Sequence, residues 1–154
     1  NDEVYKYDEE AFEASGDDII YGGAGDDDLD DQFGNNSING DDGNDFLYGS
    51  KDGMNTLTGG AGNDTFFFTG NSVVTDFQGG GAAGGDLIVL ATEFLSDLTG
   101  DGVIDEADAV ASFEVSGDDL VAELVVDGQT FTMTLTGLAT TTLTTDDFIT
   151  VSFG

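Results

Sequence analysis

The stretch GGAGDDDLD, from Gly22 to Asp30, decides the fold because it recurs in register along the chain. The same nine-residue frame returns as GDDGNDFLY, from Gly40 to Tyr48, and as GGAGNDTFF, from Gly59 to Phe67. Three further units follow the frame less closely: EASGDDIIY at 13–21, DQFGNNSIN at 31–39, and GSKDGMNTLT at 49–58, which has one extra residue. A fixed period over successive units indicates a repeat architecture, since a flexible linker has no reason to keep an apolar residue in register.

Three positions of the frame carry the pattern. The fourth is always glycine: Gly16, Gly25, Gly34, Gly43, Gly53 and Gly62. The sixth always bears a side-chain oxygen: Asp18, Asp27, Asn36, Asp45, Asn55 and Asp64. The eighth is always large and apolar: Ile20, Leu29, Ile38, Leu47, Leu57 and Phe66. Glycine permits the positive φ angles of a tight turn, and the apolar residue marks a short strand that places one side chain in a thin core.

One unit is then half a coil, and two units bring the chain back over itself. The predicted fold class is all-β: a parallel β-roll of nonapeptide repeats, followed by a β-rich C-terminal cap with a small helical insert. The predicted boundaries are a lead-in at 1–12, the roll at 13–67 and the cap at 68–154. Turns stacked on both edges of such a roll bring carbonyls and aspartates together, which suits a hard cation such as Ca²⁺.

The frame resembles the G-G-x-G-x-D-x-U-x repeat of the RTX (repeats-in-toxin, hemolysin-type) calcium-binding family. The continuation also resembles the C-terminal region of that family, through DTFFF at 64–68, VVTDFQ at 73–78, GGDLIVL at 84–90 and DDFI at 146–149. The resemblance implies a module that binds several Ca²⁺ ions, about five to seven by the same family pattern. It also implies an uncleaved signal for type I secretion in the β-rich cap.

The resemblance further implies that each ion lies between loops 18 residues apart. The first loop gives its second and fourth carbonyls, the second loop its first and third, and both loops their sixth side chains. On one edge of the roll, this rule gives a first set: Gly23, Gly25, Asp27, Gly40, Asp42 and Asp45. A second set shares one aspartate with it: Asp41, Gly43, Asp45, Gly59, Ala61 and Asp64. Beyond the last repeat, Gly60 and Gly62 need a partner loop, which Asp76 or Asp86 is placed to supply.

The opposite edge departs from the family pattern, because two of its three sixth positions are the neutral amides Asn36 and Asn55. One set there retains a single sixth-position carboxylate: Ala14, Gly16, Asp18, Asp31, Phe33 and Asn36. The next set has none, and its second loop holds the extra residue: Gln32, Gly34, Asn36, Ser50, Asp52 and Asn55. Fewer ligand charges weaken calcium binding, so we expect this edge to bind later or partially.

An independent calcium motif lies in the cap, where residues 97–108 read DLTGDGVIDEAD. Oxygen-bearing side chains fall at loop positions one, three, five, nine and twelve: Asp97, Thr99, Asp101, Asp105 and Asp108. Gly102 stands where the sharp turn needs glycine, Val103 would donate a carbonyl, and Ile104 would be the apolar anchor. The loop resembles that of an EF-hand or a dockerin module, with short helices expected at 91–96 and 106–112. A chance acidic loop is the alternative.

From Phe113 onward the pattern predicts three strands, with Gly117-Asp118 and Asp127-Gly128 as turn centres. Val121 alternates with Glu123, and apolar residues alternate with threonines over 131–135, which favours a half-buried sheet face over a ligand groove. The segment 146–154 closes the chain as a final strand or tail.

Composition excludes several classes of function. The chain has 154 residues, with 33 Asp and Glu against two Lys and a formal net charge of −31, so nucleic acids and anionic membranes are poor partners. It has no His and no Cys, which removes the commonest general base and every thiol nucleophile. No apolar run approaches the ~18 residues that a membrane span requires. The sequence starts at Asn1 rather than Met, which indicates an excised piece or a processed product.

These observations favour a secreted, extracellular calcium-binding module that folds on calcium binding and is not itself an enzyme. The resemblance implies the type I secretion machinery as a partner and support of the stability of a larger protein. The alternative is a carbohydrate-binding or adhesive module of an extracellular enzyme or adhesin, with four candidate sugar-stacking residues: Tyr5, Tyr7, Tyr21 and Tyr48. Self-association through exposed edges of the roll stays open.

Overall fold

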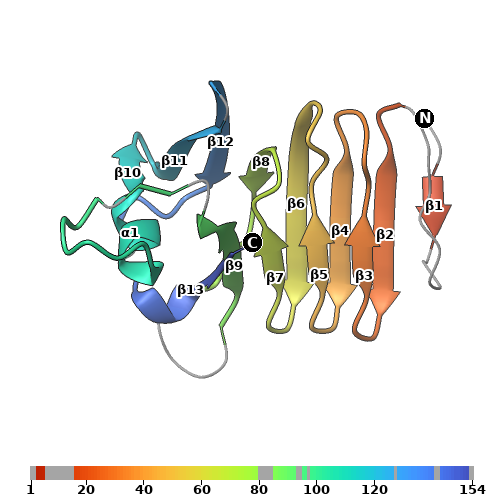
Figure 1. Cartoon of the computed structure of the whole chain (residues 1–154). Coiled ribbons are helices and arrows are strands. Elements are labelled where there is room, and N and C mark those ends of the chain that lie inside the picture. The colour runs from red at the N-terminus through yellow and green to blue at the C-terminus, as the bar shows by residue number, and fades with distance from the viewer. Residues whose placement is uncertain are drawn as a thin grey trace.

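The computed structural model describes residues 3–5, 16–79, 85–92, 95–96, 98–126, 128–140 and 143–152. The described chain forms a roll of stacked coils that starts at the N-terminal end, followed by a region that contains antiparallel strands and a helix (Figure 1). The all-β fold class predicted from the repeats is confirmed.

Two sheets make up the molecule. The first has eight strands in the spatial order β1 (Glu3–Tyr5), β2 (Ile19–Ala24), β4 (Ser37–Asp42), β6 (Met54–Ala61), β8 (Asn71–Val74), β12 (Gln129–Leu135), β11 (Asp119–Val126) and β10 (Phe113–Ser116). The second has five strands in the order β13 (Phe148–Val151), β9 (Leu87–Ala91), β7 (Thr65–Phe67), β5 (Phe46–Tyr48) and β3 (Asp28–Asp30). Successive strands of the roll alternate between the two sheets, which is the half-coil per unit that the frame predicts.

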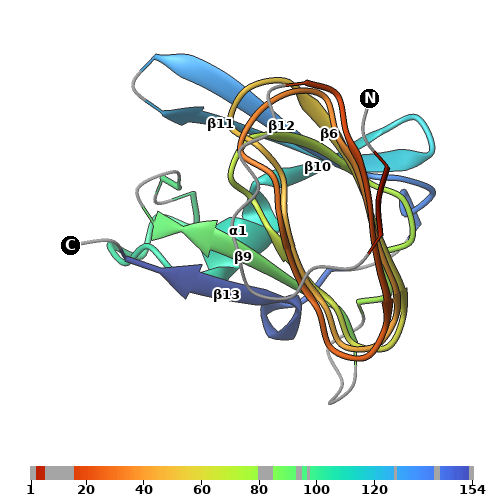
Figure 2. The same cartoon turned by 90° about the vertical axis from the view of Figure 1, so that its right-hand side faces the viewer.

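The coils stack in register, and in the end view they superpose as one flattened ring (Figure 2). All pairs between strands of neighbouring coils are parallel: β2 with β4, β4 with β6, β3 with β5 and β5 with β7. The predicted lead-in also contains a strand, because β1 adds to β2 in parallel. The fixed nine-residue frame therefore places equal positions of successive units side by side.

The eighth position of the frame forms the core of the roll. All six of its residues are buried, and they pair along the stack, as Ile20 does with Ile38 and Leu47 with Phe66. In β3 and β5 the residues that flank the buried leucine are exposed or half-buried, which leaves a core only one side chain deep in these strands. A core this thin buries little apolar surface per coil, so the loops at the two edges must contribute to holding the coils together.

The cap continues both sheets. β12 pairs in parallel with β8, the antiparallel meander of β10 to β12 extends the first sheet, and β13 pairs with β9 in the second. The three strands predicted after Phe113 and the final strand are confirmed, and Gly117 and Gly128 take positive φ in the turns. The predicted alternation of Val121 with Glu123 is wrong, because these two residues lie on the same, outer face of β11. The buried face of this strand consists of Leu120, Ala122 and Leu124.

The helix predicted after the acidic loop is present as α1 (Glu106–Ala111), and a short 3₁₀ segment, η2 (Thr145–Asp147), precedes β13. The helix predicted at 91–96 is borne out only in part: Ala91 ends β9, Thr92 is in a 3₁₀ turn and its carbonyl accepts the Leu95 N–H at 3.2 Å, and Leu95 and Ser96 are irregular. Within the described ranges, no helix has the length and apolar character needed to cross a membrane.

Candidate metal centres

Four aspartates stack along one edge of the roll, and we call this stack the Asp edge: Asp27, Asp45, Asp64 and Asp86. The last three carboxylates each accept the backbone N–H of the aspartate one coil earlier through their Oδ1 atom. The N···O distances are 2.8 Å from Asp27 to Asp45, 3.0 Å from Asp45 to Asp64 and 2.9 Å from Asp64 to Asp86. The parallel register therefore delivers one carboxylate per coil to the same line.

The second oxygen of three of these carboxylates has no hydrogen-bond partner although it is buried. This holds for Oδ2 of Asp27, Asp45 and Asp64. Burial raises the pKa of Asp45 to about 6 and also raises that of Asp64, with neighbouring aspartates adding to both shifts. A buried carboxylate oxygen without a donor is costly, and a bound cation would remove that cost.

The glycines at the first position leave the space beside these oxygens. A Cβ atom on Gly40 would collide with the Asp45 carboxylate and the Gly59 carbonyl, and one on Gly59 would collide with the Asp64 carboxylate. The first-position residue of each loop therefore lies directly against the carboxylate of its own unit. Carbonyl and carboxylate oxygens are the ligands that Ca²⁺ prefers, so the residues present fit this ion.

The two predicted ligand sets of the Asp edge lie in facing loops. The stacked loops are joined by backbone hydrogen bonds from Gly25 to the Asp42 carbonyl, at 2.8 Å, and from Gly43 to the Ala61 carbonyl, at 2.9 Å. Each of these carbonyls keeps a second lone pair for an ion. Within the described residues no three acidic side chains converge on one point, so such a site consists of two carboxylates and carbonyls.

Both residues proposed to complete the last coil lie at its end. Asp86 continues the stack, and its Oδ2 atom accepts the N–H of Gln78 at 2.7 Å. The Asp76 carboxylate instead accepts the N–H groups of Gly59 and Gly60, at 2.9 and 2.8 Å. Because Asp76 closes the turn of the last repeat, Asp86 is the one that occupies the sixth-position line.

The opposite edge, which we call the Asn edge, is the stack of Asp18, Asn36 and Asn55. The same ladder is present, since Asp18 N–H donates to Asn36 Oδ1 at 3.0 Å and Asn36 N–H to Asn55 Oδ1 at 3.2 Å. The amide nitrogens face the places where the Asp edge has unpartnered oxygens. Asn36 Nδ2 donates to the Phe33 carbonyl at 3.1 Å, and that carbonyl is one of the predicted ligands.

A carboxylate that sequence reasoning missed lies on the Asn edge. Asp31 was predicted to offer only its carbonyl, but its side chain is 2% exposed and its Oδ1 accepts the Phe33 N–H at 3.2 Å. Its Oδ2 atom has no partner, and burial, together with the charge of Asp18, raises its pKa. The signal in the sequence is the aspartate at the first frame position, where Gly22 and Gly40 stand in other units.

The acidic loop of the cap has a different arrangement. Asp97 lies outside the described residues. The buried Asp108 carboxylate accepts the N–H groups of Leu98, Thr99 and Asp105, and these hydrogen bonds lower its pKa. Asp105 caps α1 by accepting the Ala107 N–H at 2.9 Å.

Another aspartate of this loop also accepts a hydrogen bond from the backbone. Asp101 accepts the Val103 N–H at 2.8 Å in a local turn. Ile104, predicted as the apolar anchor of the loop, is 41% exposed. These contacts account for the loop as a helix cap, and its role as a calcium site stays a prediction.

The tyrosines considered for sugar stacking give no aromatic platform among the described side chains. Tyr48 stacks on Phe67, with ring centroids 4.0 Å apart and planes 15° apart, so it packs against its neighbouring coil. Tyr21 lies on the outer face of β2 and is 36% exposed. The side chain of Tyr5 and the whole of Tyr7 lie outside the described residues.

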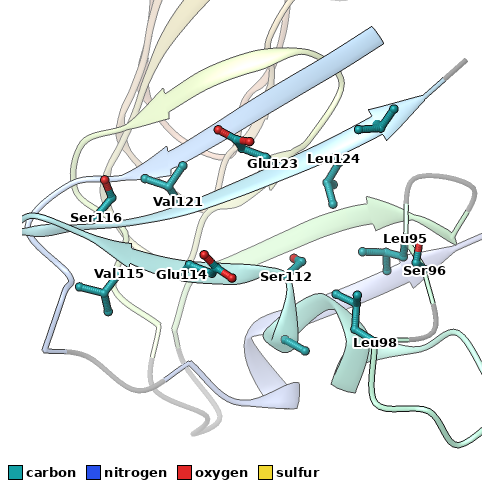
Figure 3. Close-up of a pocket in the computed structure, with 12 residues that line it drawn as sticks. Leu95, Ser96, Leu98, Ser112, Glu114, Val115, Ser116, Val121, Glu123 and Leu124 are labelled. Carbon is teal, nitrogen blue, oxygen red and sulfur yellow. The ribbon is translucent and has the colours of Figure 1, made fainter. Parts of the chain in front are cut away.

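A groove of about 880 Å³ lies in the cap, between α1, β10 and β11. Leu95 and Leu98 lie at one end and Val121 at the other, with Glu114 and Glu123 between them (Figure 3). Among the residues that the structure describes, no predicted ligand lines this groove, and its lining residues belong to neither edge of the roll.

Comparison with known proteins agrees with this geometry. Residues 14–30, 28–53 and 50–67 match the model of the RTX calcium-binding nonapeptide repeat. The fold is similar to the solution structure of the AlgE6R3 subunit of the mannuronan C5-epimerase of Azotobacter vinelandii, with a TM-score of 0.64 and 23% identity over 88% of this chain and 78% of that one. The AlgE6R2 subunit of the same enzyme gives a TM-score of 0.60 and 20% identity over 90% and 91%. No curated protein sequence matches the chain significantly.

The family match covers the six units in which the glycine, oxygen and apolar positions recur, and the structural likeness extends over the roll and the cap. Residues 14–67 of this chain are therefore RTX calcium-binding nonapeptide repeats, folded as a β-roll.

Proposed function

We propose that this module folds when calcium binds along the Asp edge, and that it thereby supports secretion and extracellular folding of a larger protein. One observation carries the proposal: the buried, unpartnered Oδ2 atoms of Asp27, Asp45 and Asp64 lie in a single line. Without a cation, these neighbouring carboxylates repel one another and lack donors. With a cation between successive coils, the same oxygens become ligands.

The free energy of calcium binding is large enough to decide whether the chain folds. A ligand that binds only the folded state stabilises it by RT ln(1 + [L]/Kd), which is ~1.4 kcal/mol per site at ten times Kd. Several such sites together reach ~5 kcal/mol or more, comparable to the net stability of a small domain. The net charge of −31 opposes compaction further, so ions shift the balance between expanded and folded chain.

This switch suits passage through a secretion channel. In a calcium-poor cytosol the chain stays expanded, and outside the cell calcium neutralises the loops and the roll forms. The match of the repeats to the RTX calcium-binding model supports the proposal of secretion by the type I route and of an extracellular location. Contacts of the cap, which continues both sheets of the roll, support folding of the two parts as one unit.

Circular dichroism in the far ultraviolet tests the proposal during a calcium titration of the calcium-free chain. We expect a cooperative gain of β signal at ~0.1–1 mM calcium, the range of extracellular modules. Magnesium is the control, since it demands shorter, near-octahedral coordination and should give little signal at the same concentration. A chain already folded in chelator and unchanged by calcium would contradict the proposal.

A further inference from the structure

The second loop pair of the Asn edge differs from every loop pair of the Asp edge. Its predicted ligands come from residues 32–36 and 50–55, and its second unit contains the extra residue. In the structure Gly49 takes the place that Gly40 has on the Asp edge. A Cβ on Gly49 would meet the Asn55 amide, as one on Gly40 would meet the Asp45 carboxylate. The extra residue is therefore accommodated immediately after Gly49, in the turn that begins at Ser50.

The inserted turn brings the Ser50 hydroxyl among the predicted ligands. Ser50 is 2% exposed, and its Oγ atom lies 2.9 Å from the Gly34 carbonyl oxygen and 2.7 Å from the Asp52 carbonyl oxygen. It also lies 3.2 Å from Asn55 Oδ1. The hydroxyl has a single proton, which these three oxygens share, and two of them are the carbonyls of the predicted ligands Gly34 and Asp52.

The Asn55 side chain makes further hydrogen bonds in the same loop pair. Asn55 is fully buried, and its Nδ2 atom donates to the Ser50 carbonyl at 2.9 Å and to the Asn71 carbonyl at 3.3 Å. Its Oδ1 atom accepts the Asn36 N–H. Neither Ser50 nor Asn55 has a buried side-chain atom without a partner, in contrast to Asp45 and Asp64 on the other edge.

We propose that this loop pair binds no calcium ion, because it has no sixth-position carboxylate and because the Ser50 hydroxyl and the Asn55 amide donate hydrogen bonds to carbonyl oxygens among its predicted ligands. The donors are the chain's own, so the loops stay joined without a cation and without charge. The inference rests on the calcium-binding function proposed above and limits it: the repeats of this chain do not load evenly. One loop pair is closed by hydrogen bonds, and the Asp edge depends on ions.

Anomalous diffraction at a long wavelength tests this on crystals of the unaltered chain grown with saturating calcium. We expect calcium peaks between the loops that hold Asp27, Asp45 and Asp64, and none between Gly34 and Asn55. A peak at the latter place would overturn the inference. Peaks absent from both edges would overturn the proposed function and still support an ion-free Ser50 loop pair.

A gain-of-site variant gives a second test by equilibrium dialysis with radioactive calcium. The double variant Ser50→Ala with Asn55→Asp removes both donors and restores a sixth-position carboxylate, so it should bind one more ion per chain than the unaltered protein. The control combines Ser50→Ala with Asn63→Asp, which adds the same charge at an exposed position and should leave the number of ions unchanged. Equal ion numbers in the unaltered chain and in the Asn55→Asp double variant would mean that an ion is already bound there.

Discussion

The two edges of the roll share one ladder of hydrogen bonds, and at Asn36 and Asn55 an amide nitrogen stands where the Asp edge has a carboxylate oxygen. On both edges, the sixth residue accepts the N–H of its counterpart one coil earlier through Oδ1. That bond needs only an oxygen, so it tolerates aspartate and asparagine alike. The other terminal atom of the side chain, Oδ2 in aspartate or Nδ2 in asparagine, decides the chemistry. An Oδ2 atom leaves a buried acceptor that suits a cation, whereas an Nδ2 atom donates to a carbonyl and closes the loop without an ion.

The substitution Asp45→Asn should have the largest effect, because it makes the centre of the Asp edge resemble the Asn edge. Asp45 belongs to both predicted sites there, so the variant should lose two ions and ~3 kcal/mol of calcium-dependent stability at ten times Kd. Its Oδ1 ladder bond can persist, which separates loss of ions from loss of the ladder. A calcium titration followed by circular dichroism should show the midpoint rise about tenfold or more.

The matched control for that experiment is Asp26→Asn, which makes the same charge change one loop position earlier. Asp26 is exposed, and it accepts the N–H of Asn44 at 2.8 Å through an oxygen that asparagine would retain. Its calcium midpoint should stay within a factor of two of the unaltered protein. Similar shifts in both variants would show that net charge, and not the Asp45 position, governs folding.

A pair of glycine variants tests how closely the loops stack along the Asp edge. Gly25 and Gly62 both occupy the fourth frame position with positive φ, at 113° and 145°. A Cβ at Gly25 would meet nothing, whereas one at Gly62 would collide with the Gly43 carbonyl. Urea unfolding in saturating calcium should show Gly25→Ala losing ~1–2 kcal/mol from the left-handed conformation, and Gly62→Ala losing more. Equal losses would mean that the coils do not approach as closely as described.

Acid should act through the buried carboxylates whose pKa is raised in the folded chain, among them Asp45 and Asp64 on the Asp edge and Asp31 on the Asn edge. The folded, ion-free pKa of Asp45 is about 6, above the ~3.9 of an unfolded aspartate, so the folded state binds the extra proton. Without calcium, stability should therefore increase as pH falls from 7 toward 5, and this gain is lost again as pH rises through about 6. Far-ultraviolet dichroism of the calcium-free chain measures it, and Asp45→Asn should reduce the gain. A signal independent of pH would contradict the raised pKa.

The smallest effect is expected for variants of Asp105, in the acidic loop of the cap. They test whether this loop binds calcium, as we propose for the Asp edge. If Asp105 acts as the cap of α1, Asp105→Asn should keep stability within a few tenths of a kcal/mol, and Asp105→Ala should lose ~1 kcal/mol. Neither should change the number of bound ions. Loss of one ion in Asp105→Asn would instead support the predicted EF-hand-like site. Thermal unfolding and equilibrium dialysis in calcium provide the two readouts.

The architecture of the roll could be predicted from the sequence, because the residue types at fixed positions determine the conformation of each unit. Position four needs glycine and position eight needs an apolar side chain, and 18 or 19 residues separate equal positions on one edge. Period and residue type together therefore predict the coils and the stack of aspartates on the Asp edge. The strands after Phe113 were also predictable, since Gly117 and Gly128 mark their turns.

Tertiary contacts decided what the sequence could not. The frame assigns Asp31 a carbonyl role, and only the packing beside Asp18 shows that its carboxylate is buried. From the frame, the extra residue only interrupts one predicted calcium site. In the structure the inserted turn places the Ser50 hydroxyl beside two carbonyl oxygens of that site. In the cap, a loop with the spacing of a calcium motif satisfies its carboxylates with backbone N–H groups, a choice that residue spacing does not reveal.

The pairing of β12 with β8 has a kinetic consequence. Thr132 N–H donates to Asn71 Oδ1 and the Thr136 hydroxyl to the Thr75 carbonyl, each across 61 residues of sequence. The edge of β8 exists only once the last coil has formed, and closing so long a segment is slow relative to adding one coil to the next. Folding should therefore occur in two phases, with a calcium-limited growth of coils followed by docking of the cap, which seals the last open edge of the roll.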